Sequence, residues 1–148
     1  MQKLNFPSYS FRFKSSENYI QIFDVIRKKF VALQPEEWVR QHVVHYLRND
    51  KNYPASLINV EKQLMVNGLP KRYDIVVFQP NGNIELLVEC KSPKTTITQE
   101  VFDQIAIYNL SLKANYLMVT NGLSHYYCQF DGEERKYRFL VQIPDFSL

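Results

Sequence analysis

The sequence predicts an α/β fold with a central mixed β-sheet flanked by helices and with an N-terminal β-hairpin. Strand-like and helix-like periodicities alternate along the chain, which is the pattern of a layered α/β protein. The ten Tyr and ten Phe favour pleated, half-buried surfaces. No internal repeat or linker interrupts the 148 residues. We therefore expect the order βββ–α–βββ–α–β(ββ) in one domain, residues 1–148, with a core at about 19–131.

The first three expected strands precede the first helix. Alternating residues predict a hairpin made of Ser10–Lys14 and Tyr19–Phe23, with a turn at residues 15–18 between them. Phe30–Leu33 adds a short extended segment. The chain therefore opens with β-structure.

Pro35, followed by Glu36 and Glu37, indicates a helix start, because proline suits the first turn and acidic side chains favour the positive end of the helix dipole. The helix is expected to run from about Pro35 to Arg48. Its apolar residues recur with helical spacing, and we expect Val44 to lie outside the core-facing stripe. That stripe consists of Val39, Val43, Tyr46 and Leu47.

The rest of the chain alternates between expected strands and a second helix. This helix should span Thr98–Leu112, with four residues on its apolar face. Those residues are Val101, Ile105, Tyr108 and Leu112. Turns are expected at 67–70, 81–82 and 121–122. The expected strands are Ser56–Val66, Tyr73–Phe78, Ile84–Lys91, Asn115–Thr120, Tyr126–Phe130 and Tyr137–Ile143.

Composition limits the class of protein. Hydrophobic residues make up 45% and charged residues 22%, which is the balance of a folded globular chain. The net charge of +3 is too small to identify a nucleic-acid binder by itself. Cys90 and Cys128 lack paired spacing, which favours a reducing compartment. No apolar run approaches the ~20 residues that span a bilayer, so we expect a cytoplasmic protein without a membrane partner.

The hairpin around Asn81-Gly82 places acidic residues together. Asn-Gly favours a two-residue type I′ turn, and with these two residues in the loop Pro80 faces Asn83. Counting back along both strands then sets Asp74 opposite Glu89. Opposed residues share a face of the sheet with Cβ atoms about 4.5–5.5 Å apart, so the two acids are expected to lie close together.

Two carboxylates beside apolar neighbours need a shared proton or a cation. Oxygen ligands of this kind suit Mg²⁺ or Mn²⁺, which usually retain waters and bind phosphate oxygens. Lys91 lies two residues after Glu89 and should point to the same side of the strand, where it can orient an attacking water. A Glu-x-Lys triplet alone is weak evidence, because surface strands often alternate such charges. The apolar strand and the opposed aspartate strengthen the case.

Other polar groups are less specific. His42 and His45 lack partners at zinc-finger spacing, which favours packing or exposed histidines over ligands. Two short basic runs, Arg27-Lys28-Lys29 and Arg135-Lys136 with Arg138, are candidate phosphate contacts, but such runs are usually solvated surface.

Asp74, an apolar strand, a turn and Glu89-Cys90-Lys91 together resemble the core of the PD-(D/E)XK nuclease superfamily, although Tyr73 stands where the superfamily's name has proline. Four motifs in order are similar to the N-terminal nuclease domain of type I restriction enzyme R subunits, from about Tyr19 to Asp131. They are Pro35–Gln41, Tyr73–Val77, Val88–Pro93 and Gln104-x-x-x-Tyr108. The resemblance implies a restriction-endonuclease-like core.

The resemblance also implies roles. Asp74 and Glu89 would ligate the metal with the backbone carbonyl of Cys90, and Lys91 would serve the attacking water. A glutamate from the first helix would join them. The helical wheel favours Glu36, which should project toward the core, and leaves Glu37 open; for either, an ordinary solvated helix-start acid is an equal alternative.

Gln104 and Tyr108, four apart on the second helix, would contact nucleic acid or steady Lys91. From the residues alone, Tyr108 is equally well a core residue and Gln104 a surface residue.

We therefore expect a Mg²⁺- or Mn²⁺-dependent DNA endonuclease domain that hydrolyses phosphodiester bonds. The sequence holds no GxxxxGK[ST] phosphate loop, so the ATP-driven motor of full-length R subunits is absent, and motor or specificity subunits would be separate partners. The alternative is a non-catalytic nucleic-acid-binding or scaffolding module with the same fold.

Overall fold

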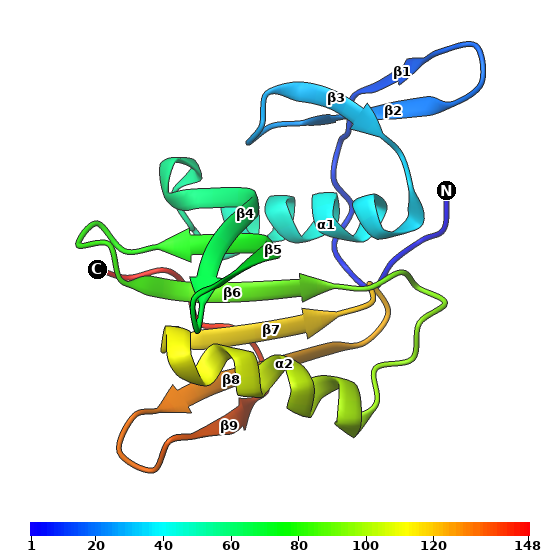
Figure 1. Cartoon of the computed structure of the whole chain (residues 1–148). Helices are drawn as coiled ribbons and strands as arrows, with labels where there is room; N and C mark the ends of the chain where they lie inside the picture. Colours follow the sequence, from blue (N-terminus) through cyan, green and yellow to red (C-terminus); the bar gives the residue numbers. More distant parts are fainter.

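The computed structural model describes residues 1–148 and has an α/β architecture (Figure 1). A six-stranded mixed sheet forms the centre, two helices pack against it, and a three-stranded antiparallel sheet lies beyond α1. Three strands, a helix, three strands, a helix and three strands follow one another along the chain, as predicted. No helix combines the length and apolar composition needed to cross a bilayer.

Most bounds lie within three residues of the predicted ones, but β5 begins at Leu69, four residues before the predicted Tyr73, and α1 gives way to a π-helix at Tyr46, before the predicted end at Arg48. The small sheet contains β1 (Phe13–Ser15), β2 (Ile20–Asp24) and β3 (Lys29–Ala32). The large sheet contains β4 (Ile58–Val66), β5 (Leu69–Phe78), β6 (Ile84–Cys90), β7 (Tyr116–Thr120), β8 (His125–Asp131) and β9 (Lys136–Leu140). The helical segments are α1 (Pro35–His45), the π-helical η1 (Tyr46–Asp50), the 3-10 turn η2 (Ala55–Leu57) and α2 (Gln99–Leu112).

The six strands of the large sheet lie in sequence order, and only β6 and β7 are parallel. Helix α2 makes the crossover between these two strands, as a parallel connection requires. The helices cover opposite faces, because residues of α1 share a core with Ile75 and Val88 whereas residues of α2 share one with Val76 and Leu87. Strands β5 and β6 are therefore interior strands buried on both faces.

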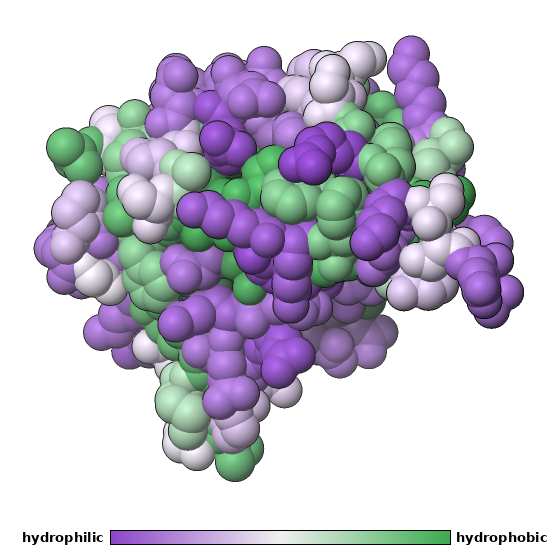
Figure 2. Space-filling view, turned by 90° about the horizontal axis from the view of Figure 1, so that it is seen from above, coloured by the Kyte–Doolittle hydropathy of each residue, from purple (hydrophilic) through white to green (hydrophobic).

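Helix α1 is buried on more sides than its apolar stripe indicated. Val39 and Val43 are fully buried as predicted, but Val44, expected outside the stripe, is also fully buried. Val44 lies one helical turn beyond Gln41, whose side-chain amide donates to Asp24 of β2. The small sheet therefore covers this side of the helix, and the prediction for Val44 was wrong. The molecular surface that is seen from above is mostly hydrophilic and has smaller apolar areas (Figure 2).

Helix α2 begins where predicted, because Thr98 caps it by accepting a hydrogen bond from the Val101 backbone N–H at 3.2 Å. Its buried face, however, is rotated from the predicted one: it carries Phe102, Ile105 and Asn109, whereas Tyr108 is 48% exposed. Asn109 tolerates burial because its side-chain amide donates to the Tyr137 hydroxyl.

The β5–β6 turn differs from the predicted type I′ turn. The Gly82 backbone N–H donates to the Gln79 carbonyl and only Gly82 has a positive φ, so the loop comprises three residues, 80–82. This loop shifts the pairing by one residue, and Phe78 faces Ile84. An extra residue in β6, Glu85, then shifts it back, so that Val77 faces Leu86. The predicted register is therefore correct from Val77 to Ile75, where the regular ladder ends, although the predicted turn was wrong.

Candidate metal centre

The regular alternation of side chains between the two faces of the sheet is broken in β5 at Asp74. Tyr73 belongs to the core beneath α2, but Ile75, two residues along, belongs to the core beneath α1. The β4–β5 ladder pairs Val60 with Ile75 and Lys62 with Tyr73, and it omits Glu61 opposite Asp74. Glu61 has a φ of 53°, a left-handed conformation that breaks the regular pleat. The kink turns the Asp74 carboxylate toward α1.

Two groups fix the Asp74 carboxylate. Arg40 of α1 donates to Oδ1 through Nη2 at 2.8 Å and Nε at 3.3 Å. The Cys90 backbone N–H donates to Oδ2 at 2.7 Å. The second bond takes the place of a ladder contact, because the regular β5–β6 pairing ends at Ile75 and Val88. Asp74 therefore joins α1 to the end of β6.

Glu89 is a buried acid without a full set of partners. It is 9% exposed, and its Oε1 is buried without a hydrogen bond. Burial, and next the negative charge of Asp74, raise the pKa of Glu89 to about 7. This is the electrostatic conflict between Asp74 and Glu89 that the hairpin register predicted. An orphaned carboxylate oxygen of this kind is a ready ligand for a cation.

Glu36 and Lys91 complete the charges around these two acids. The Glu36 side chain is 49% exposed at the start of α1, where partial burial and the charge of Asp74 raise its pKa. Lys91 follows β6 and donates its backbone N–H to the Thr120 carbonyl at 2.8 Å. The charge of its side chain acts on both Glu36 and Glu89. The structure thus brings these four predicted residues into one electrostatic group.

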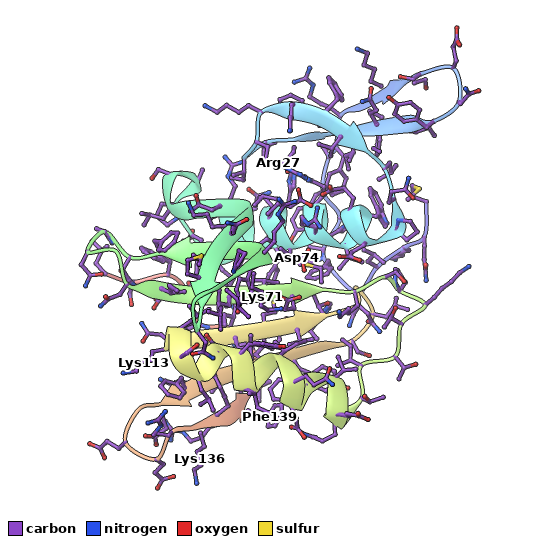
Figure 3. All side chains as sticks on the ribbon, viewed as in Figure 1. Arg27, Lys71, Asp74, Lys113, Lys136 and Phe139 are labelled. Carbon is purple, nitrogen blue, oxygen red and sulfur yellow. The ribbon has the colours of Figure 1, made fainter.

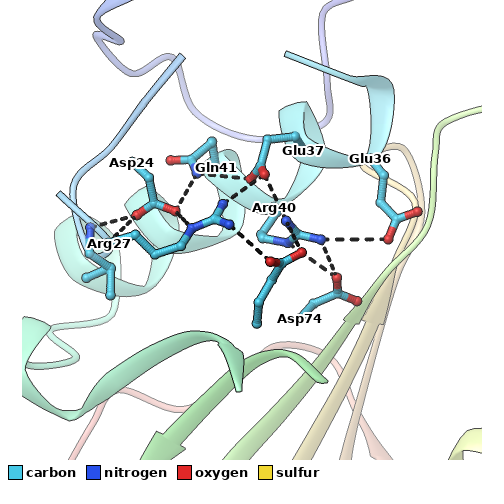
Figure 4. Close-up of polar contacts among 9 residues, drawn as sticks. Asp24, Arg27, Glu36, Glu37, Arg40, Gln41 and Asp74 are labelled. Carbon is cyan, nitrogen blue, oxygen red and sulfur yellow. Dashed lines mark hydrogen bonds and ion pairs between the residues drawn. The ribbon is translucent and has the colours of Figure 1, made fainter. Parts of the chain in front are cut away.

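Glu36 and Glu37, the two glutamates at the start of α1, lie in different environments. Glu36 was expected to project toward the core, but it is exposed, whereas Glu37 is 8% exposed. Glu37 accepts hydrogen bonds from Arg27 at 2.8 Å, Arg40 at 2.8 Å and Gln41 at 3.1 Å (Figure 4). Glu36 lies 3.9 Å from Arg40, which also binds Asp74, and it keeps a more accessible carboxylate. It is therefore the better placed of the two candidates.

A buried chain of ion pairs leads from the small sheet to this site. Asp24 of β2 is fully buried and accepts from Arg27 Nε at 2.6 Å and from Gln41 at 3.0 Å. These bonds hold the pKa of Asp24 below its usual value although burial alone would raise it. Arg27 reaches on to Glu37, and Glu37 to Arg40. Arg27, a candidate phosphate contact by sequence, is therefore committed to internal ion pairs.

Sequence reasoning missed Arg40. Its side chain is 8% exposed, and the negative charges of Glu37 and Asp74 raise its pKa against the opposing effect of burial. The sequence nevertheless contains a signal for a buried ion pair, because Arg40 directly follows the apolar-stripe residue Val39 and stands three residues after Glu37. A charged residue on a buried helix needs a partner, and Asp74 is that partner.

Gln104 and Tyr108 lie on the exposed side of α2. The Nζ of Lys71 on β5 lies 4.7 Å from the ring centroid of Tyr108 and 5.1 Å from that of Tyr73. The charge of Lys71 also acts on Glu89. Tyr108 is therefore a surface residue linked to the site through Lys71, and the core alternative for it was wrong. Gln104 lies one turn earlier on the helix and is exposed, and its side chain makes no hydrogen bond within the protein.

Cys90 and the histidines have structural surroundings. The Cys90 thiol is buried beneath α1, and this burial raises its pKa, while its backbone N–H serves Asp74. His42 packs against Trp38 with ring centroids 4.4 Å apart, and its Nδ1 lies 2.8 Å from the Trp38 carbonyl oxygen. Burial lowers its pKa. His42 is therefore a packing histidine, which was one of the expected alternatives.

The arrangement supplies carboxylate oxygens for a hard cation near the end of β6, where Asp74 accepts from the Cys90 N–H and Glu89 keeps an unpaired oxygen. The charges of Lys71 and Lys91 act on Glu89. Asp74 and Lys71 are labelled in Figure 3, and Figure 4 shows Asp74 and Glu36 with Arg40 between them. Asp74 remains paired with Arg40, and no three His, Cys, Asp or Glu side chains converge closely enough to form a complete ligand set. Two carboxylates with waters are nevertheless a usual Mg²⁺ coordination.

A comparison with protein families gives a match over most of the chain. The family described as type I restriction enzyme R protein N terminus (HSDR_N) matches residues 35–144, more than half of the chain. The matched range begins at the first residue of α1 and includes β4–β9, so it contains every candidate site residue. A comparison with curated proteins gave no match.

Proposed function

The chain belongs to the family of the type I restriction enzyme R protein N terminus, and on that premise we propose that it is a metal-dependent DNA endonuclease domain of the PD-(D/E)XK nuclease superfamily. One observation carries the proposal. The buried Glu89 has an unpartnered carboxylate oxygen and shares its electrostatic environment with Asp74, Glu36 and Lys91. A buried pair of acids next to a lysine is expected where chemistry on a phosphate requires a bound cation.

The residues fit Mg²⁺ or Mn²⁺. Glu89 offers its free Oε1, and Asp74 Oδ2 retains one lone pair beyond the hydrogen bond that it accepts from Cys90. The Cys90 carbonyl is the further protein ligand implied by the resemblance. A bound divalent ion would neutralise charge on the scissile phosphate and lower the pKa of a bound water.

The surrounding side chains would handle the substrate. Lys91 would orient the attacking water and stabilise charge that develops on the phosphate. Glu36, the exposed acid beside Asp74, would bind an outer water of the site. Tyr108 and Gln104 face solvent on α2 and would contact the DNA strand, and Lys71 would add a positive charge next to Tyr108.

The proposed partners follow from the family. DNA is the substrate, and separate motor and specificity subunits would bring it to the domain, as expected for a type I restriction enzyme.

Cleavage of DNA tests the proposal. Lys91→Ala and Asp74→Ala should each abolish Mg²⁺-dependent cutting of plasmid DNA while circular dichroism shows an intact fold. Lys94→Ala is the matched control, because Lys94 is an exposed lysine three residues after Lys91, and it should cut like the wild type. Equal cutting by the wild type and both site variants would reject the nuclease proposal.

The Arg40–Asp74 ion pair favours a second candidate, a non-catalytic nucleic-acid-binding or scaffolding module. In such a module the guanidinium, rather than a metal, neutralises Asp74 permanently. Calorimetric titration with Mn²⁺ separates the two. The nuclease should show one saturable site that Glu89→Gln removes, and the binding module should show no saturable site while it still binds DNA.

A further inference from the structure

Arg40 occupies the centre of a group of acids. Its guanidinium lies 2.8 Å from Glu37 and 2.8 Å from Asp74. Two further carboxylates are nearby, at 3.4 Å for Glu61 and 3.9 Å for Glu36. Only 8% of the Arg40 side chain is exposed, so solvent screens these interactions weakly. The single buried guanidinium of Arg40 thus forms ion pairs with carboxylates from α1, β4 and β5.

This position has a consequence for any cation that Asp74 binds. Arg40 contacts the Asp74 carboxylate directly, so a divalent ion on the same carboxylate would lie next to a guanidinium. Like charges a few ångströms apart repel strongly where the effective dielectric constant is low.

Arg40 can leave Asp74 without losing its charge balance. Its Nη1 bonds Glu37 and lies near Glu61, whereas Nη2 and Nε serve Asp74. A small rotation of the guanidinium would give up Asp74 and keep the other acids. Glu37 is itself held by Arg27, which is fixed by Asp24 of β2. The small sheet therefore secures the alternative partner of Arg40.

We infer that Arg40 is an internal cation that neutralises Asp74 in the metal-free protein and competes with a divalent metal for that carboxylate, with Glu37 retaining the guanidinium when the metal binds. The inference rests on the proposed function, because it assumes that Asp74 is a metal ligand. Arg40 is a positioning residue in this scheme: it acts on the site through Asp74.

The affinity for Mn²⁺ tests the competition. Arg40→Gln should bind Mn²⁺ about tenfold tighter than the wild type, since it removes a like charge from the site. Arg40→Lys keeps the charge and should stay within about threefold of the wild type. Arg138→Gln, a change at an exposed arginine of β9, is the matched control and should not alter the affinity. Adding Glu89→Gln to Arg40→Gln should remove the tightened site.

A wild-type measurement keeps the inference testable if Arg40→Gln does not fold. In NMR spectra, Mg²⁺ should shift the Arg40 Nε–Hε signal and the Cys90 amide signal with one common saturation curve, because both groups donate to Asp74. A Cys90 shift without an Arg40 shift would overturn the inference.

The remaining outcomes separate this inference from the proposed function. A folded Arg40→Gln that binds Mn²⁺ no tighter than a metal-binding wild type overturns the inference alone. If neither the wild type nor Arg40→Gln has a saturable site, both proposals fall. A site that is present only in Arg40→Gln supports the competition and shows that Arg40 prevents binding in the wild type.

Discussion

At the scale of single residues, Glu89 combines burial, a free carboxylate oxygen and a pKa of about 7 against an ordinary value of 4.5. An acid whose pKa is raised in the folded state stabilises the fold below the unfolded-state pKa, and this contribution is lost as the pH rises through the folded-state pKa. Without metal, wild-type stability relative to Glu89→Gln should therefore fall by about 2 kcal/mol between pH 5 and pH 8. Urea unfolding in EDTA measures the difference.

A matched variant controls for general effects of pH. Glu134 is an exposed acid in the β8–β9 turn, and Glu134→Gln should show no such relative change. A flat difference between the wild type and Glu89→Gln across this pH range would mean that Glu89 is not held in an unfavourable charged state.

The register of β5 against β6 could be predicted from Val77 to Ile75 because it depends on one local hairpin, and the regular ladder ends one residue before Asp74 and Glu89. Even there the prediction succeeded through two compensating features, the three-residue loop and the extra residue Glu85. The role of Arg40 could not be predicted in the same way. Its partners Glu37, Glu61 and Asp74 come from different elements, and periodicity does not show which elements meet.

At the scale of elements, α1 is unusual in being enclosed by the large sheet and the small sheet. Val44→Ala should lower the free energy of unfolding by about 2 kcal/mol, because a fully buried side chain leaves a cavity. Val141→Ala is the matched control, since Val141 is 98% exposed and its truncation should cost less than about 0.5 kcal/mol. Similar losses for the two variants, measured by chemical unfolding, would contradict this description of α1.

The starts of the helices followed from local signals, Pro35 for α1 and the spacing of apolar residues for α2. The faces that the helices bury did not follow. A hydrophobic stripe assumes one covered face, but the small sheet covers a second face of α1. On α2 the polar Asn109 takes a buried position because Tyr137 accepts its hydrogen bond, and Tyr108 is left exposed.

At the scale of the whole molecule, the ion-pair chain from Asp24 to Asp74 joins the two sheets. Arg27→Met should lower the free energy of unfolding by about 3 kcal/mol, because it leaves the buried acids Asp24 and Glu37 without their shared cation. Lys29→Met, at an exposed lysine of β3, should change it by less than about 0.5 kcal/mol. Thermal unfolding of both variants measures the contrast, and equal effects would show that the chain contributes little.

The fold class and the order of elements could be predicted for the whole molecule, since alternating periodicities determine them. The position of the small sheet over α1 could not, because Asp24 and Arg27 carry no sequence signal that names Glu37 as their partner. The proposed metal centre lies where that long-range chain meets the local hairpin.

The most direct measurement of the proposed metal centre is anomalous diffraction from crystals soaked in Mn²⁺. We expect a peak about 2.0–2.3 Å from carboxylate oxygens of both Asp74 and Glu89, with the Arg40 guanidinium moved from Asp74 toward Glu37. A saturating soak that gives no peak between these two acids, and leaves Arg40 on Asp74, would contradict it.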